Sequence, residues 1–136
     1  MDDRRRLTGF TLVELIISVA IFAVLFLIAI PSYLGYLQQG RRADAVTSLL
    51  HLQLLQAEWR IDHGEYATLE ELSWQAGKEN SLDGFYTIVV LNRGAGGYRG
   101  IAEPVKGQID DACGVFAINE VGTVYSGYAG PACWGR

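Results

Sequence analysis

The sequence predicts an α+β protein in which one long N-terminal helix, with an apolar first half, precedes a small antiparallel sheet. Three observations lead to this prediction. No charged residue occurs between Leu15 and Gly40, and most of this stretch is apolar. A helical periodicity follows over residues 41–63. Four short segments rich in β-branched and aromatic residues come after residue 84.

The apolar stretch is long enough to cross a membrane as a helix. About 20 apolar residues span a bilayer, and a helix satisfies its own backbone hydrogen bonds there. Arg4, Arg5 and Arg6 precede the stretch, which predicts a cytoplasmic N-terminus and places the rest of the chain on the outer side. Glu14 is the one charge inside the apolar block; it lies near the start, where a carboxylate costs less than at the centre.

The apolar stretch could also belong to a conventional signal peptide or to a permanent membrane anchor. A signal peptide would be cleaved after the apolar residues, and Ala29 is a small residue at about that place. However, no Ala-x-Ala pattern follows Leu27, and the stretch is longer than an ordinary signal peptide requires. A permanent anchor would keep the whole N-terminal segment and would never be processed.

The second helical segment has two apolar faces and a defined end. One face has apolar residues three and four apart, and a second stripe lies about opposite. One face is expected to cover a sheet, and the other to meet a loop or a neighbouring subunit. Gly64 is the predicted C-cap. The first face carries Val46, Leu50, Leu54, Ala57 and Ile61. The second stripe carries Leu52, Leu55 and Trp59.

A connection and four predicted strands follow. Residues 65–83 are polar with some helical character at 68–72, and apolar residues can hold them against the body. The strand predictions form an antiparallel meander. The predicted strands are Phe85–Leu91, Tyr98–Ala102 (ending before Pro104), Cys113–Asn119 and Thr123–Tyr128. The apolar residues expected to hold the connection against the body are Tyr66, Leu69, Leu72 and Trp74.

Composition limits the classes of function. The 136 residues carry a net charge of −4; residues 1–9 contribute +1, so the remainder carries −5. About 100 residues outside the membrane suffice for one small domain. An acidic domain counts against nucleic acid as the default partner. Cys113 and Cys133 are expected to form a disulfide in an oxidising compartment, with two free buried thiols as the alternative.

No catalytic or metal site is predicted. His51 and His63 are twelve residues apart without Cys or Glu at ligand spacing. Serines lack an evident base, and there is no phosphate-binding loop, so neither an enzyme nor a cofactor is expected. Carboxylates at Glu103, Asp110 and Asp111 match no known calcium loop, and whether they bind calcium stays open.

The segment Gly9-Phe10-Thr11-Leu12-Val13-Glu14 closely resembles the leader and helix start of type IV pilins and pseudopilins. The resemblance implies cleavage after Gly9 by a prepilin peptidase, N-methylation of Phe10, and a role for Glu14 in filament assembly. It implies a helix kink at Pro31, Gly35 and Gly40. It also makes residues 65–83 the variable αβ-loop, which often contacts neighbours in the filament.

The C-terminal segment resembles the minor pilins of the PilE type in type IVa pili. Cys113-Gly, Phe-Ala-Ile-Asn119, Gly122 and Cys133-Trp134 carry this resemblance, in which the cysteines bracket the D-region. It implies a leader at 1–9, a membrane or filament-core helix at 10–31, and the rest of the helix with a globular head at 32–136. Expected partners are other pilins, the peptidase, the inner-membrane assembly platform and lipid; no specific nucleic acid is expected.

The function implied is a structural, minor pilin that leaves the inner membrane for an extracellular filament used in adhesion, twitching motility or DNA uptake. A pseudopilin of a type II secretion system is one alternative; the cysteine pair favours the pilus. A DNA-binding pilin is another. Its candidate phosphate contacts, Arg93, Arg99, Lys106 and Arg136, are scattered over an acidic domain.

Overall fold

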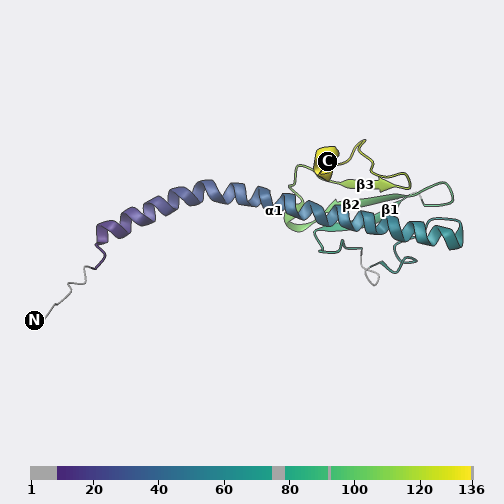
Figure 1. Ribbon diagram of the computed structural model, residues 1–136, viewed down its shortest axis with the longest axis horizontal. Coiled ribbons are helices and arrows are strands. Elements are labelled where there is room, and N and C mark those ends of the chain that lie inside the picture. Colours follow the sequence, from purple (N-terminus) through teal and green to yellow (C-terminus); the bar gives the residue numbers. More distant parts are fainter. Residues whose placement is uncertain (1–8, 75–78, 92, 136) are drawn as a thin grey trace, which may run out of the picture. The chain divides into compact units, whose positions relative to one another are not determined.

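One helix, α1, runs from Leu12 to His63. The computed structural model describes residues 9–74, 79–91 and 93–135 (Figure 1). Gly64 follows α1 with φ at 75°, and its amide donates to the carbonyl of Arg60 at 2.9 Å. Glycine adopts this left-handed conformation without steric cost, so the predicted C-cap is confirmed.

The chain divides into two units, Met1–Tyr36 and Leu37–Arg136. The second unit, here called the head, holds the later part of α1 and the sheet. The division falls within the stretch that contains Pro31, Gly35 and Gly40, through which α1 continues as one helix. The kink there and the boundaries predicted for leader, membrane helix and head stay predictions.

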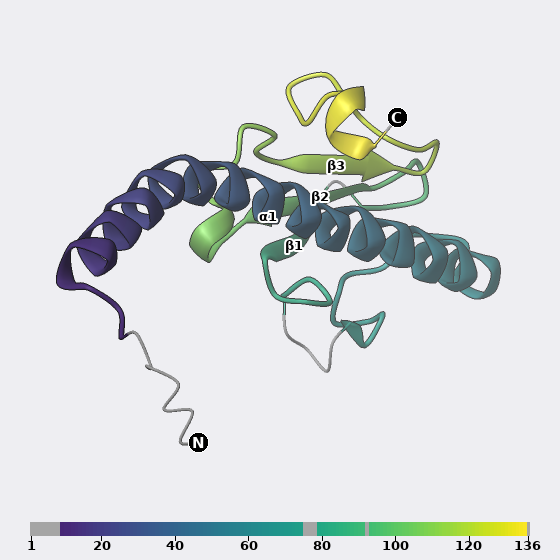
Figure 2. The ribbon, with the colours of Figure 1, turned by 60° about the vertical axis from the view of Figure 1, so that its left-hand side comes forward.

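The head contains a three-stranded antiparallel sheet in the order β1-β2-β3, which lies along the second half of α1 (Figures 1 and 2). The strands are β1 (Tyr86–Leu91), β2 (Arg99–Pro104) and β3 (Phe116–Asn119). Short helices η2 (Lys106–Gln108) and η3 (Pro131–Trp134) follow β2 and close the chain. The α+β class and the antiparallel meander are confirmed.

Three of the four strand predictions differ from the structure by more than one residue. β2 continues to Pro104, whose nitrogen has no hydrogen to donate. A proline is tolerated there because β3 pairs with β2 only as far as Ala102, so no strand on that side needs the donor. β3 begins at Phe116 because Gly114, with φ at 57°, belongs to a turn. The predicted fourth strand, Thr123–Tyr128, is reduced to a single bridge between Thr123 and Ile118. The turn in which the Tyr128 amide donates to the Tyr125 carbonyl ends the pairing.

The face of α1 that covers the sheet overlaps the second predicted stripe, since Leu52 is fully buried and Leu55 packs against the core. Its inward side chains recur four, three and four residues apart, as a helix face requires. Leu50, Leu54 and Ile61, which the sequence placed on one apolar face, are 51%, 66% and 84% exposed. Two of the inward positions are polar, and hydropathy alone identified only Leu52 on this face. The inward positions are Ala45, Ser48, Leu49, Leu52 and Gln56.

Gly100 in β2 lets α1 approach the sheet closely. A Cβ at this position would lie 2.7 Å from Cδ2 of Leu52 and 3.2 Å from Cγ1 of Ile118. Leu52 and Ile118 are both fully buried, so neither side chain has room to move away. The glycine therefore sets the spacing between helix and sheet.

The connection after α1 is held to the head, as predicted. Gln56 exchanges two hydrogen bonds with Ala67, its Nε2 donating to the carbonyl at 2.7 Å and its Oε1 accepting from the amide at 2.9 Å. Trp74 is buried, and its Nε1 donates to the carbonyl of Asn80 at 2.8 Å. Tyr66 joins the core cluster, and Leu69 and Leu72 pack against it.

A buried carboxylate joins α1 to the segment before β1. The Asp44 side chain accepts hydrogen bonds from the Ser81 hydroxyl at 2.5 Å, the Asp83 amide at 2.9 Å and the Phe85 amide at 3.1 Å. Ser48 donates to the same carboxylate at 3.3 Å. Backbone and hydroxyl donors thus satisfy both carboxylate oxygens, which makes burial of the charge tolerable.

Asp44→Asn is expected to destabilise the head by about 3 kcal/mol, because an amide nitrogen replaces one acceptor and faces donors that stay buried. Chemical denaturation of the full chain in detergent, followed through the tryptophans, measures this. Asp62→Asn makes the same change at an exposed position of α1 and should lie within about 0.5 kcal/mol of the parent. Equal stability of the two variants would contradict the role given to Asp44.

Candidate functional site: the N-terminal helix and the surfaces of the head

The segment expected to be processed leads directly into α1. Gly9 and Phe10 precede the helix, and the Thr11 hydroxyl accepts a hydrogen bond from the Glu14 amide at 3.2 Å. Thr11 is thus the N-cap of α1. Glu14 lies in the first turn, where a negative charge interacts favourably with the helix dipole.

The first half of α1 presents apolar side chains on every side. All large apolar residues from Leu12 to Ile30 are between 54% and 76% exposed, and Phe10 is 75% exposed. A window of this helix has a mean hydropathy of 3.0 and meets the length and composition of a membrane span. Water is a poor environment for such a surface, so it requires lipid or other protein around it.

Within the described residues, Glu14 makes no ion pair. Its backbone carbonyl accepts a hydrogen bond from the Ser18 hydroxyl at 2.7 Å, but its carboxylate has no hydrogen-bond partner there. The carboxylate is therefore available to a group outside this chain.

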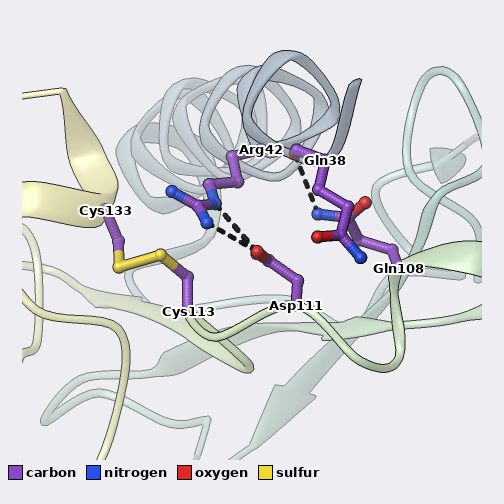
Figure 3. Close-up of polar contacts among 6 residues, drawn as sticks. All are labelled: Gln38, Arg42, Gln108, Asp111, Cys113 and Cys133. Atoms are coloured by element: carbon purple, nitrogen blue, oxygen red, sulfur yellow. Dashed lines mark hydrogen bonds and ion pairs between the residues drawn. A yellow bond between two sulfur atoms is a disulfide. The ribbon is translucent and has the colours of Figure 1, made fainter. Parts of the chain in front are cut away.

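A polar cluster joins the loop after β2 to the first turns of α1 in the head (Figure 3). Arg42 donates from Nε and Nη2 to the Asp111 carboxylate at distances between 2.6 and 3.1 Å. The Asp111 side chain is only 1% exposed, and its hydrogen bond raises the pKa of Arg42. Gln108 is fully buried and donates from Nε2 to the carbonyl of Gln38 at 3.0 Å.

The disulfide between Cys113 and Cys133 closes the C-terminal segment beside this cluster (Figure 3). The two Cα atoms are 5.8 Å apart. η3, which contains Cys133, carries the buried Trp134, whose ring meets Phe116 of β3 edge to face at 5.3 Å. The disulfide predicted from the sequence is present and holds the last segment of the chain on the sheet.

The outer face of α1 in the head borders an open groove of about 880 Å³, here called the α1 groove. Its helical side is formed by Leu50, Leu54 and Ile61, and its floor includes Tyr66 and Tyr98. The Tyr98 hydroxyl is buried without a hydrogen-bond partner among the described residues, and burial raises the pKa of Tyr98. The groove thus lies along the first predicted face of α1, which carries Leu50, Leu54 and Ile61 and is largely exposed among the described residues.

Two of the four candidate phosphate contacts are brought together. Arg93 and Arg99 line a hollow of about 340 Å³ at the glycine-rich loop between β1 and β2, together with Glu120. The Arg99 guanidinium lies 5.9 Å from the centre of the Tyr128 ring. Lys106 belongs to η2 and does not line this hollow, and Arg136 lies outside the described residues.

No group of three potential metal ligands is found among the residues that the structure describes. Asp111 is bound to Arg42, while Glu103 and Asp110 are exposed. His51 packs against Trp74 with ring centres 5.3 Å apart, and His63 stacks on Trp59 at 3.8 Å. Both histidines thus have aromatic neighbours that account for their positions.

Sequence reasoning missed three polar arrangements, of which two are local. Thr11-x-x-Glu14 has the spacing of a capping box, and the same spacing recurs at Thr68 and Glu71. At the second site both bonds form: the Thr68 amide donates to Glu71 at 2.7 Å and the Glu71 amide to Thr68 at 3.0 Å. These hydrogen bonds lower the pKa of Glu71. The Asp44 network had no such signal, because its partners lie 37 to 41 residues away.

Cys113→Ser is expected to lower the free energy of unfolding by about 2–5 kcal/mol, since the 20-residue loop loses its covalent closure. Thermal or chemical denaturation of the full chain with and without a reductant measures this. The reductant should have little effect on the variant and a large effect on the parent. A parent that is equally stable when reduced would contradict the stabilising role of the disulfide.

Two protein families match this chain. Residues 31–117 match the family described as type IV minor pilin ComP, DNA uptake sequence receptor. Residues 4–30 match the prokaryotic N-terminal methylation motif. The second match covers the processing segment and the apolar half of α1, and the first covers most of the head.

Among characterised proteins, the chain is similar to core protein G of type II secretion systems. It is 30% identical over 71 residues to that of Vibrio cholerae, covering 52% of this chain and 49% of the relative. The protein of Aeromonas hydrophila is 26% identical over 69 residues, with 51% and 48% covered. The chain thus spans about half the length of the curated relatives it matches.

These matches agree with the long apolar helix, the antiparallel sheet and the C-terminal disulfide. Family membership favours a structural protein over an enzyme. Because the minor-pilin match extends over more than half of the sequence, the chain belongs to the type IV minor pilins, within the type IV pilin superfamily.

Proposed function

We propose that this minor pilin is cut between Gly9 and Phe10, methylated at Phe10, and moved from the inner membrane into an extracellular filament. The observation that carries this proposal is the apolar half of α1, which is exposed on every side. Lipid covers this surface before assembly, and the helices of other subunits cover it afterwards. The Arg4–Arg6 triplet favours a cytoplasmic leader with the head outside.

Cleavage before Phe10 would place a new positive charge close to Glu14. Four residues separate them, a rise of about 6 Å along a helix. In a filament of axially staggered subunits, the amine of one subunit can lie level with Glu14 of another. The attraction is stronger in an apolar environment than in water, so the pair would set the axial position of an incoming subunit.

The head offers a second surface for such packing. The apolar half of α1 and the α1 groove are different surfaces, and both lack a cover among the described residues. When one surface of a subunit packs on a different surface of the next, the contact need not close into a ring and can continue as a filament. We propose that helices of neighbouring subunits occupy the α1 groove.

Glu14→Val should leave membrane insertion and cleavage intact, because it makes the segment more apolar. It should reduce incorporation into filaments about tenfold or more, because the incoming subunit loses its partner for the new amine. The assay is the amount of this protein in sheared filaments relative to its membrane pool. Ser18→Val makes the same helix more apolar without removing a charge, and it should assemble like the parent. Equal incorporation of the Glu14 and Ser18 variants would contradict the pairing.

Membership of a secretion pseudopilus is the alternative that the core protein G relatives support. The head of this chain is fixed by a disulfide, which favours the pilus. Recovery of the protein from sheared surface filaments, and normal protein secretion in cells that lack it, would distinguish the pilus from the secretion system.

DNA binding is a second candidate function, favoured by the description of the matched family as a DNA uptake sequence receptor. This weighs against the expectation, drawn from the acidic composition, that no specific nucleic acid binds. Arg93 and Arg99 are the candidate phosphate contacts, since they line one hollow with backbone of the glycine-rich loop.

Arg93→Gln and Arg99→Gln should each weaken binding of duplex DNA and lower the slope of log affinity against log salt by about 1. Fluorescence anisotropy with labelled duplexes at several salt concentrations measures this. Lys106→Gln removes one positive charge on a loop away from the hollow and should leave the slope unchanged. An unchanged slope in the arginine variants, or no binding by the parent, would exclude this surface as the receptor site.

A further inference from the structure

The part of α1 that belongs to the head carries a regular series of uncharged, exposed residues, here called the α1 seam. Its successive members are alternately four and three residues apart, which is the spacing of the d and a positions of a coiled coil. The three largest members, Leu50, Leu54 and Ile61, are 51%, 66% and 84% exposed. The α1 seam consists of Ala43, Thr47, Leu50, Leu54, Ala57 and Ile61, and all six are exposed.

The seam is narrow, because polar residues border it on both sides. With Leu54 taken as an a position, His51 and Glu58 lie at e positions, and Gln53 and Arg60 lie at g positions. An apolar stripe confined to a and d positions has the width of a two-helix contact, whereas a helix packed among several others carries a wider apolar face. The α1 seam therefore fits one partner helix.

The helix that carries the seam is fixed by contacts on its other side, where the sheet lies along it (Figures 1 and 2). Leu49 and Leu52 are fully buried in the core of the head. Gln56 exchanges two hydrogen bonds with Ala67. The seam is thus a preformed surface, and a partner helix would bind it with little further loss of conformational freedom.

We propose that the α1 seam pairs with the α1 seam of a second copy, as a parallel two-stranded coiled coil, while both chains are anchored in the membrane. This inference rests on the proposed membrane anchoring, since chains inserted in the same orientation have N-termini on the same side. The residue types agree with two strands, because Ile61 lies at an a position and Leu50 at a d position, the combination that favours a parallel dimer.

The residues beside the seam are compatible with a second copy in this register. In a parallel pair, each g residue lies beside an e residue of the next heptad of the other helix. Gln53 would lie beside Glu58 of the other copy, to whose carboxylate its amide can donate, and Val46 would lie beside His51. No like charges meet at these positions, so a second copy needs no change in the chain to fit.

Pairing through the seam would also govern entry into the filament. Leu50, Leu54 and Ile61 belong to the seam and also form the helical side of the α1 groove. A second copy on the seam therefore competes with the neighbouring helices proposed to occupy that groove. The pair would cover these apolar residues in the membrane and would have to separate before the subunit is incorporated.

The test places the photoreactive amino acid p-benzoylphenylalanine at Thr47 of the full chain, in cells that lack the inner-membrane assembly platform. Illumination should link two copies of this chain, and the linked peptide of the second copy should lie within residues 43–51. The same probe at Glu103, which is exposed on β2, should give about fivefold less linked dimer or lower. An antiparallel pair would instead link Thr47 to the last turn of α1.

Leu54→Glu should lower the yield of linked dimer about tenfold or more, because it removes two apolar side chains from the contact and brings two carboxylates together. Leu50→Glu should act in the same way at the neighbouring layer. Ile109→Glu makes the same kind of change outside the seam, at a residue that is 63% exposed, and should link like the parent. Non-reducing electrophoresis checks that each variant keeps its disulfide.

Links from Thr47 only to other proteins or to the last turn of α1, or an undiminished yield in both seam variants, would overturn the proposal. Alkaline extraction of the membranes separates this inference from the one on which it rests. If extraction releases the chain, membrane anchoring itself is wrong. If the chain stays in the membrane and Thr47 gives no link to a second copy, only the pairing through the seam is wrong.

Discussion

The structure depends on one constraint: the first half of α1 carries apolar side chains on every side, and they need a cover that this chain does not provide among its described residues. Burial of each large apolar side chain is worth about 1.5–3 kcal/mol relative to exposure. More than a dozen such residues make water an untenable surrounding for this segment. Lipid and neighbouring helices are equivalent covers in this respect, which explains how one segment can serve first as an anchor and later as part of a filament.

The head has the opposite organisation, because the same helix is held there by specific contacts. Leu49 and Leu52 pack on the sheet, Gly100 sets the distance, and Asp44 binds the backbone before β1. Arg42 and the disulfide attach the later loops. Polar contacts specify position more strictly than apolar packing does, because a buried donor or acceptor without its partner is costly. A head fixed by specific contacts is joined to a helix segment that is apolar on every side. This combination suits a subunit whose helix exchanges lipid for other subunits while the surface of its head stays the same.

Much of this organisation was predictable from local patterns. The apolar stretch, the glycine that ends α1, the cysteine pair and the positions of three strands each follow from a short segment of sequence. The rest depends on contacts between distant residues. The buried face of α1 includes Ser48 and Gln56, whose partners lie in later loops, so hydropathy identified Leu52 on this face and otherwise pointed to the exposed face with Leu50, Leu54 and Ile61. The fourth strand has suitable residues at Thr123 and Val124, but a turn at Tyr125–Tyr128 ends its pairing. Both candidate arginines were visible in the sequence, while their shared hollow was not.

The function proposed for this chain has two parts, processing at the N-terminal motif and incorporation into a filament. Mass analysis of the N-terminal peptide, performed on the protein recovered from sheared filaments, tests both parts at once. We expect a peptide that begins with methylated Phe10. A protein absent from the filaments, or one whose chain begins at Met1 or beyond Pro31, would contradict the proposed function.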